Sequence, residues 1–156
     1  MLNGLFTGAL LAILALLLAV AAVVDVRTFT ISNRLNLAVA LLAPVYWFAA
    51  LLGPGDVILQ VAAAVVVFVL FAGAFYAGMM GGGDVKLAAA LALWFPPYAT
   101  IKLLVIMSFA GGLLTLGVLA WHRWRGREGR PEIPYGVAIA VGGLAILTQR
   151  FLNQFA

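Results

Sequence analysis

The chain has 156 residues, of which 66% are hydrophobic and only 9% are charged, and its formal net charge is +4. Because a soluble domain carries roughly a quarter charged residues, this composition excludes a soluble globular protein and predicts an integral membrane protein. The apolar runs are continuous and do not alternate with polar residues, which excludes a membrane β-barrel and predicts helices. The chain contains no cysteine and a single histidine, His122, so we expect no metal centre and no other cofactor.

Six stretches of the sequence are predicted to form helices within a single domain over residues 1–156. The expected helices are Leu5–Val24, Leu35–Leu52, Val57–Ala77, Asp84–Phe95, Thr100–Trp121 and Pro134–Leu152. The first is about as long as the ~20 residues that span a bilayer and lacks a positively charged start, so we expect a retained helix and not a signal peptide. The predicted fold is therefore an all-α integral membrane protein, a bundle of six transmembrane helices.

The fourth predicted helix is anomalous because it must end before Pro96 and Pro97. Its length corresponds to roughly 18 Å, against a bilayer hydrocarbon core of about 30 Å. Three glycines, Gly81, Gly82 and Gly83, precede it. Non-helical backbone at membrane depth is tolerated only where protein or a wet cavity surrounds it. We therefore expect the glycines to form a flexible break and the helix to be short and recessed below the cytoplasmic surface.

The basic residues predict the orientation of the bundle. Seven of the nine lie in the loop after the first helix, beside the start of the fourth, or in the loop after the fifth: Arg27, Arg34, Lys86, Arg123, Arg125, Arg127 and Arg130. These three connections fall on one side, because an even number of helices separates them. The positive-inside rule assigns that side to the cytoplasm, so both termini are predicted to lie outside.

The three aspartates of the chain fall into two groups. Asp56 follows Pro-Gly in an outer turn and is expected to be the N-cap of the third helix. Asp25 closes the first helix and Asp84 opens the fourth, so the topology brings two carboxylates to one membrane level. Ionisable residues within transmembrane segments are costly and mark functional sites. Two aspartates that approach in a partly dry site are expected to share one proton, as aspartic proteolysis requires.

The glycine-rich stretch before the fourth helix resembles a known signature. "GMMGGGDVKLAAALAL", residues 78–93, is similar to the Gly-x-Gly-Asp motif of the type IV prepilin peptidases, a family of membrane aspartic peptidases. Gly81, Gly83 and Asp84 stand at the motif positions. A single Gly-x-Gly-Asp motif is a weak signal, and its weight comes from the two further motifs that accompany it.

Two other segments resemble the same family in the same order. "DVRTFTISNRLN", residues 25–36, is similar to the family's first aspartate segment, and "PYGVAIAVGG", residues 134–143, is similar to its last-helix motif. Ser32 stands where the family usually has proline. We expect Asn33 or hydrogen bonding by the serine to hold the turn in its place.

The resemblance implies an aspartic endopeptidase of the bacterial inner (cytoplasmic) membrane with Asp25 and Asp84 as its catalytic pair. Such an enzyme removes the basic leader of prepilins or pseudopilins at the cytoplasmic face, cutting after a glycine. Larger members of the family carry an insertion with paired cysteines and also methylate the new N-terminus. This chain resembles the short, peptidase-only members of the Tad/Flp pilus type, so no N-methyltransferase activity is expected. The implied partners are the substrate helix and membrane lipid.

Three further polar residues are expected near the pair. Lys86 is a marker of the cytoplasmic side or a charge that biases a neighbouring carboxylate. Asn33 and Tyr135 either orient the substrate or cap a helix, and the sequence leaves both roles open. No surface that combines basic and aromatic residues indicates a nucleic-acid partner.

The same carboxylates permit two other functions. One is a small proton- or ion-coupled transporter, since broken helices and acids at membrane depth are typical of that class. Against it, both aspartates lie toward one side and the other half of the chain has no matching broken helix. The other alternative is a non-catalytic scaffold of a secretion machine, which would tolerate the loss of both acids.

Overall fold

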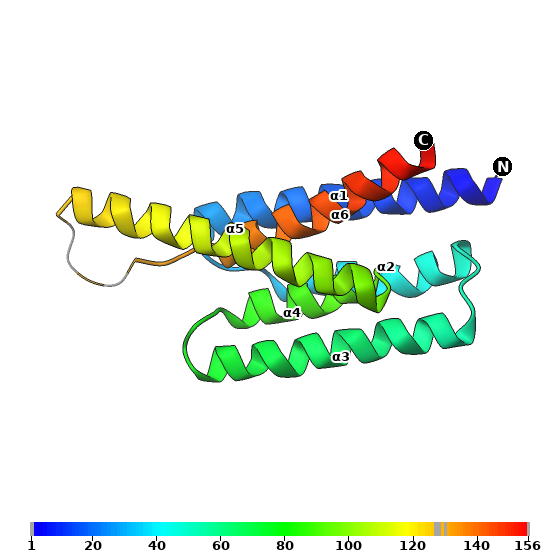
Figure 1. The fold of residues 1–156 in the computed structure, drawn as a ribbon, viewed down its shortest axis with the longest axis horizontal. Coiled ribbons are helices and arrows are strands. Elements are labelled where there is room, and N and C mark those ends of the chain that lie inside the picture. Colours follow the sequence, from blue (N-terminus) through cyan, green and yellow to red (C-terminus); the bar gives the residue numbers. More distant parts are fainter. Residues whose placement is uncertain (1, 127–128, 130, 156) are drawn as a thin grey trace.

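The computed structural model describes residues 2–126, 129 and 131–155, which form six α-helices and no β-strand. The helices are α1 (Leu2–Thr28), α2 (Asn33–Ala49), α3 (Pro54–Tyr76), α4 (Gly82–Ala92), α5 (Pro97–Trp124) and α6 (Tyr135–Phe155). Every predicted helix is present, so the all-α prediction is confirmed. Figure 1 shows an elongated bundle in which α1 begins and α6 ends at the same end of the molecule.

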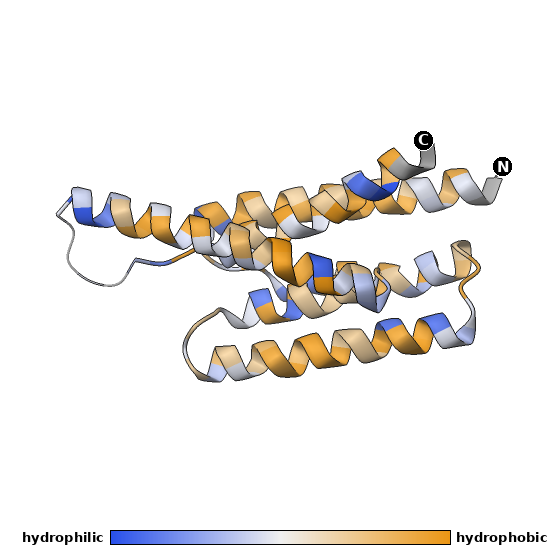
Figure 2. Ribbon diagram, in the orientation of Figure 1, coloured by the Kyte–Doolittle hydropathy of each residue, from blue (hydrophilic) through white to orange (hydrophobic). Residues whose placement is uncertain are grey.

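Four of the helices are long and apolar enough to cross a membrane. They are Gly4–Thr28, Pro54–Tyr76, Pro97–Trp124 and Tyr135–Leu152, within α1, α3, α5 and α6. Figure 2 shows hydrophobic residues along these long helices, and many large apolar side chains are exposed on the surface of the bundle. Exposed apolar side chains of this number are stable only where the surrounding solvent is lipid. The chain is thus a helical, multi-pass membrane protein.

The short fourth helix lies inside the bundle. It has 11 residues and contacts α2, α3 and α6. Seven of its residues are buried: Asp84, Val85, Leu87, Ala88, Ala90, Leu91 and Ala92. A helix too short to span a bilayer is stable in this position because neighbouring helices, and not lipid, surround its ends.

The start of α4 differs from the prediction. Gly82 and Gly83 are the first two residues of the helix and Gly81 is its N-cap, so the expected break of three glycines is largely helical. The connection from α3 turns instead at Gly78, whose φ of 69° is a conformation that other residues rarely adopt. The physical reason is packing. Gly83 allows α4 to lie close against the backbone of Ile31, where a Cβ atom would lie 2.8 Å from the Ile31 carbonyl oxygen.

The start of α3 also corrects a prediction. The helix begins at Pro54, which fits the first helical position because its missing N–H has no intrahelical partner there. Gly53 is therefore the N-cap, and the prediction that Asp56 holds this position is wrong. Asp56 lies in the first turn of α3, where the helix dipole favours a negative charge.

Aromatic residues fix the far end of α4. Trp94 is fully buried, stacks on Tyr46 of α2 with ring centroids 5.2 Å apart, and donates from Nε1 to the carbonyl oxygen of Val39 at 3.0 Å. Trp47 donates from Nε1 to the carbonyl oxygen of Leu93 at 2.8 Å. Each indole N–H thus finds an acceptor in the opposing helix or turn, and α2 and α4 are held in register.

Helix α5 extends beyond the rest of the bundle, as Figure 1 shows. Gly111 of α5 lies at the level of the start of α6, because a Cβ atom added to Gly111 would lie 3.5 Å from the Cβ atom of Ala138. From Gly111 the helix continues through apolar residues to Trp121, a further rise of about 15 Å. The start of α6 is therefore well below the tip of α5.

Candidate active site

Asp25 lies on the buried face of α1. Residues at alternating spacings of three and four line this face and are at most 4% exposed: Leu11, Leu14, Leu18, Ala21 and Asp25, the last 2% exposed. A helix presents positions with this spacing on one side, so the leucine stripe that packs α1 into the bundle also directs Asp25 inward. Because α1 continues to Thr28, Asp25 lies within the helix and not at its end.

The N-terminus of α6 meets the Asp25 carboxylate. A Cβ atom added to Gly136 would lie 2.8 Å from Asp25 Oδ2 and 2.9 Å from Asp25 Cγ. The backbone amides of Gly136 and Val137 face this carboxylate. The first N–H groups of a helix have no intrahelical partner, so they offer partial positive charge to an anion at this point.

Asp84 stands at the third position of α4 and is 8% exposed. Its Oδ2 accepts a hydrogen bond from the backbone N–H of Gly81 at 3.2 Å. This bond gives a partner to one of the free N–H groups at the helix start, as in a capping box. One oxygen of Asp84 thus caps the start of the helix, while the other is buried beside it.

Ile31 connects the two acidic residues. Its side chain reaches the start of α6, where a Cβ atom added to Gly136 would lie 2.6 Å from Ile31 Cδ1. Its backbone lies against α4, where a Cβ atom added to Gly83 would lie 2.8 Å from the carbonyl oxygen of Ile31. The loop between α1 and α2 therefore packs between Gly136, which lies against Asp25, and Gly83, which precedes Asp84 in sequence. The carboxylates are close enough for their charges to interact.

Asn36 adds a polar contact to this cluster. It is 5% exposed, and its Nδ2 donates to the carbonyl oxygen of Gly83 at 2.9 Å. Ser32 is the N-cap of α2, and its Oγ accepts from the backbone N–H of Leu35 at 3.3 Å. Of the two predicted ways of holding this turn without proline, by Asn33 or by serine hydrogen bonding, the structure shows the serine bond.

The other predicted site residues lie farther from the carboxylates or face elsewhere. Lys86 is exposed and donates from Nζ to Asn33 Oδ1 at 2.8 Å, so it pairs with an amide and not with Asp84. Tyr135 begins α6, and its ring lies 3.8 Å from the Cβ position of Gly111 in α5. Among the described residues, no group of three or more metal-ligating side chains is placed to hold a metal ion.

The sequence did not single out Ile31 or Gly136 as site residues, and the two differ in how far the sequence could have indicated them. Gly136 stands in the "PYG" motif at the start of the last helix, so its position was visible but its contact with Asp25 was not. Ile31 is an ordinary apolar residue in a polar loop, and only its 7% exposure distinguishes it.

One oxygen of each aspartate remains available. Asp25 Oδ2 and Asp84 Oδ1 are buried and accept no hydrogen bond within the described part of the chain. A buried carboxylate oxygen without a donor is costly, so native proteins retain one where water or a ligand completes it. The cluster therefore presents two unfilled acceptors on different helices, an arrangement that can hold and polarise a water molecule.

The fold and this cluster define a helical membrane protein with a buried pair of carboxylates. A sequence model of the type IV leader peptidase family matches residues 12–116, which is more than half of the chain. The chain belongs to this family and is a peptidase of the prepilin leader peptidase type. Neither a curated protein nor a solved structure matches it. The matched residues include Asp25 and Asp84 but end before α6, so the contact of Gly136 lies outside the match.

Proposed function

We propose that the protein is an aspartic endopeptidase of the Gly-x-Gly-Asp type in which Asp25 and Asp84 are the catalytic residues. The observation that carries the proposal is that two buried carboxylates from different helices each retain an oxygen without a donor. Peptide hydrolysis needs a base for water and an acid for the carbonyl oxygen, and a carboxylate pair that holds one proton supplies both. The titration belongs to the pair, so neither residue is assigned the proton.

The proposed hydrolysis of the peptide bond follows from the proton that the two carboxylates share. The ionised carboxylate accepts a proton from water as the water oxygen bonds to the peptide carbonyl carbon. The protonated carboxyl donates its proton to the carbonyl oxygen, which gives a neutral tetrahedral diol. The carboxyl that took the water proton then donates it to the leaving nitrogen as the C–N bond breaks, and the other carboxylate accepts the proton of one diol hydroxyl as the product carboxyl group forms, so that one proton again remains on the pair. No cofactor enters this balance.

The proposed substrates are type IV or Flp prepilins or pseudopilins, cut after a glycine at the cytoplasmic face. This part of the proposal rests on membership of the leader peptidase family and on the motifs of residues 25–36 and 78–93. N-methyltransferase activity is not proposed, because the cysteines associated with it are absent from these 156 residues.

A lateral groove supports access for a substrate helix from the membrane. It has a volume of about 510 Å³ and lies between α2, α3 and α4. One end is polar and contains Asn33, Asn36 and Lys86, and the walls below are apolar, with Ala64, Phe68 and Leu93 among them. The apolar segment of a prepilin is the occupant that fits, because its polar leader would then lie at the end of the groove nearest to Gly83 and Asp84.

We further propose that the chain is one domain whose six helices lie in the bacterial inner membrane with both termini outside. The basic residues of the predicted cytoplasmic connections support this orientation. In this orientation the carboxylates lie below the cytoplasmic end of α5, since Gly136 lies near the level of Gly111 and α5 continues for about 15 Å to Trp121. Helix α4 is then recessed, in agreement with its short length.

Processing of a co-expressed prepilin tests the catalytic proposal. Asp25→Asn and Asp84→Asn should each abolish the mobility shift that accompanies leader removal. Asp56→Asn is the matched control, because it removes the third aspartate of the chain in a turn at the other end of α3. Mass spectrometry of the new N-terminus should identify cleavage after a glycine. Full processing by either of the first two variants contradicts the assignment.

A further inference from the structure

A second cavity of the described bundle lies away from the aspartates. It has a volume of about 620 Å³ and is lined by residues of α2, α3, α5 and α6 together with the turn between α4 and α5. Phe95, Pro96 and Pro97 in its lining follow the last residue of α4, whereas Asp84 stands at the first turn of that helix. The cavity thus lies at the opposite end of α4 and has no role in the proposed hydrolysis.

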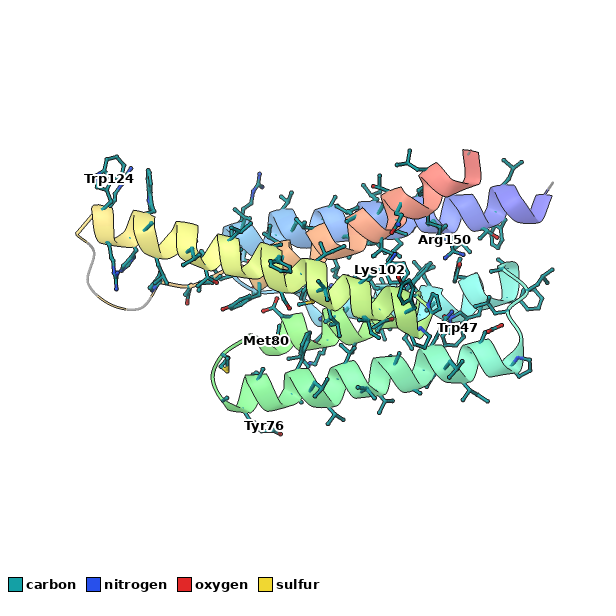
Figure 3. All side chains as sticks on the ribbon, in the orientation of Figure 1. Trp47, Tyr76, Met80, Lys102, Trp124 and Arg150 are labelled. Carbon is teal, nitrogen blue, oxygen red and sulfur yellow. The ribbon has the colours of Figure 1, made fainter. Side chains whose placement is uncertain are left out.

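Two cationic side chains line this cavity, Lys102 of α5 and Arg150 of α6. Figure 3 shows both on the half of the molecule where α1 begins and α6 ends. Lys102 Nζ lies 4.7 Å from the centroid of the Tyr98 ring, and Arg150 Cζ lies 5.3 Å from the centroid of the Tyr46 ring. A guanidinium group has five N–H donors and an ammonium group three, so each cation keeps donors for an anion beside its tyrosine.

A buried amide adds a further hydrogen-bond donor to the cavity. Gln60 lines the cavity, is 4% exposed, and accepts on Oε1 from Trp47 Nε1 at 2.8 Å. This bond orients the amide oxygen toward Trp47, so the NH₂ group is the part of the side chain left to donate to a ligand. The carboxylate of Asp56 also lines the cavity, but it turns back toward the start of α3, with Oδ2 3.5 Å from the Cβ position of Gly53. The donors that the lining offers to a ligand are those of Lys102, Arg150 and Gln60, beside the oxygen atoms of Asp56, Gln149 and two tyrosines.

The rest of the lining is apolar. Leu52, Leu59, Phe95 and Ile146 contribute to the walls. A donor set beside an apolar wall fits an anion that carries hydrocarbon. The cavity also lies at the end of the apolar helices, the level at which lipid headgroups meet a membrane protein. A guanidinium group matches the geometry of a phosphate in two parallel hydrogen bonds, and an ammonium group binds phosphate as a point charge.

We propose that this cavity binds the phosphodiester headgroup of a membrane phospholipid through Lys102, Arg150 and the amide of Gln60. The glycerol and the first acyl carbons lie against the apolar wall. The site holds α2, α3, α5 and α6 together at the end of the bundle away from the aspartates.

Native mass spectrometry of the full chain in detergent tests this proposal with three probes. Dioctanoyl-phosphatidylglycerol should bind saturably and at least about tenfold more tightly than dioctanoylglycerol, which has the same chains and no phosphate. Inorganic phosphate should bind at least about tenfold more weakly than the lipid, since it lacks the contacts with the apolar wall. Equal affinity for dioctanoylglycerol, or equal affinity for inorganic phosphate, overturns the assignment of a phospholipid.

Substitutions connect the binding to the named residues. The double variant Lys102→Gln/Arg150→Gln should weaken lipid binding at least about tenfold, and Gln60→Glu should do so by placing a carboxylate against the phosphate. Lys102→Arg and Arg150→Lys keep the charges and should retain binding, which separates loss of the site from loss of folding. Arg34→Gln removes an exposed cation near the start of α2 and should bind as the unaltered protein does. Unchanged binding by the double variant overturns the site.

Discussion

Gly136 is in direct contact with the carboxylate of Asp25, and a Cβ atom at this position would lie 2.8 Å from Asp25 Oδ2. The same atom would lie 2.6 Å from Ile31 Cδ1. A residue of the last helix thus fixes the space available to an acid of the first helix. The absence of a side chain at residue 136 is part of the site.

Gly136→Ala should strongly reduce prepilin processing, because the added methyl group must displace Asp25 or separate α6 from α1. The carboxylate cannot move toward lipid without losing its neighbours, so the loss should exceed about tenfold, equivalent to about 1.4 kcal/mol. Gel-shift kinetics with a co-expressed prepilin measure it. Gly112→Ala and Gly117→Ala are matched controls, because nothing lies within 4 Å of a Cβ atom at either position. If Gly136→Ala processes prepilin as the controls do, the contact has no catalytic importance.

Gly83→Ala and Gly143→Ala should differ in cost although both positions are close-packed. At Gly83 the added methyl group meets the backbone of Ile31, which cannot rotate away. At Gly143 it meets δ-carbons of Leu18 and Leu91 at 2.7 and 2.8 Å, and these side chains can change rotamer. Overpacking typically costs ~1–3 kcal/mol, and we expect Gly83→Ala at the upper end and Gly143→Ala at the lower end. Thermal unfolding in detergent compares them, and the reverse order would contradict the packing described here.

Asn36 and Asn33 form a second matched pair. Asn36→Ala removes the bond from a buried side chain to the Gly83 carbonyl oxygen and should cost about 1 kcal/mol of stability together with much of the activity. Asn33→Ala removes only the exposed bond to Lys86 and should change stability by less than about 0.5 kcal/mol. Equal losses of activity in the two variants would instead favour a direct substrate contact by Asn33.

Single cysteines test the proposed orientation, since the chain has no cysteine of its own. Thr30→Cys and Arg125→Cys occupy exposed positions in the two basic connections, and Gly55→Cys occupies an exposed position near the start of α3. In intact cells a membrane-impermeant maleimide should label Gly55→Cys only. After lysis it should label all three variants. Labelling of Thr30→Cys in intact cells would invert the proposed topology.

The sequence alone was sufficient for the elements of the fold and for the family. Composition predicted a membrane protein, and continuous apolar runs predicted helices, because only helices and closed β-barrels pair their backbone groups within lipid and barrel strands alternate. The paired prolines Pro96 and Pro97 predicted that α4 ends before them, and hydrogen bonding by Ser32 was one of two predicted ways of holding the turn before α2. Proline geometry and serine capping both act over a few residues, so they can be recognised in the sequence. Asp25 and Asp84 were found in the same way, since charges are rare in such a chain and each stood out beside a motif.

Only the tertiary structure determined what surrounds those acids. The glycines before Asp84 were expected to provide a flexible break, but Gly82 and Gly83 are helical, and at Gly83 the contact with Ile31 leaves no space for a side chain. Lys86 is two residues from Asp84 in sequence yet pairs with Asn33, since the helix turns the lysine side chain toward the exposed face. The meeting of Gly136 with Asp25 joins the last helix to the first. Local sequence determines which residues form a helix, whereas contacts across more than one hundred residues depend on how the helices fill space together.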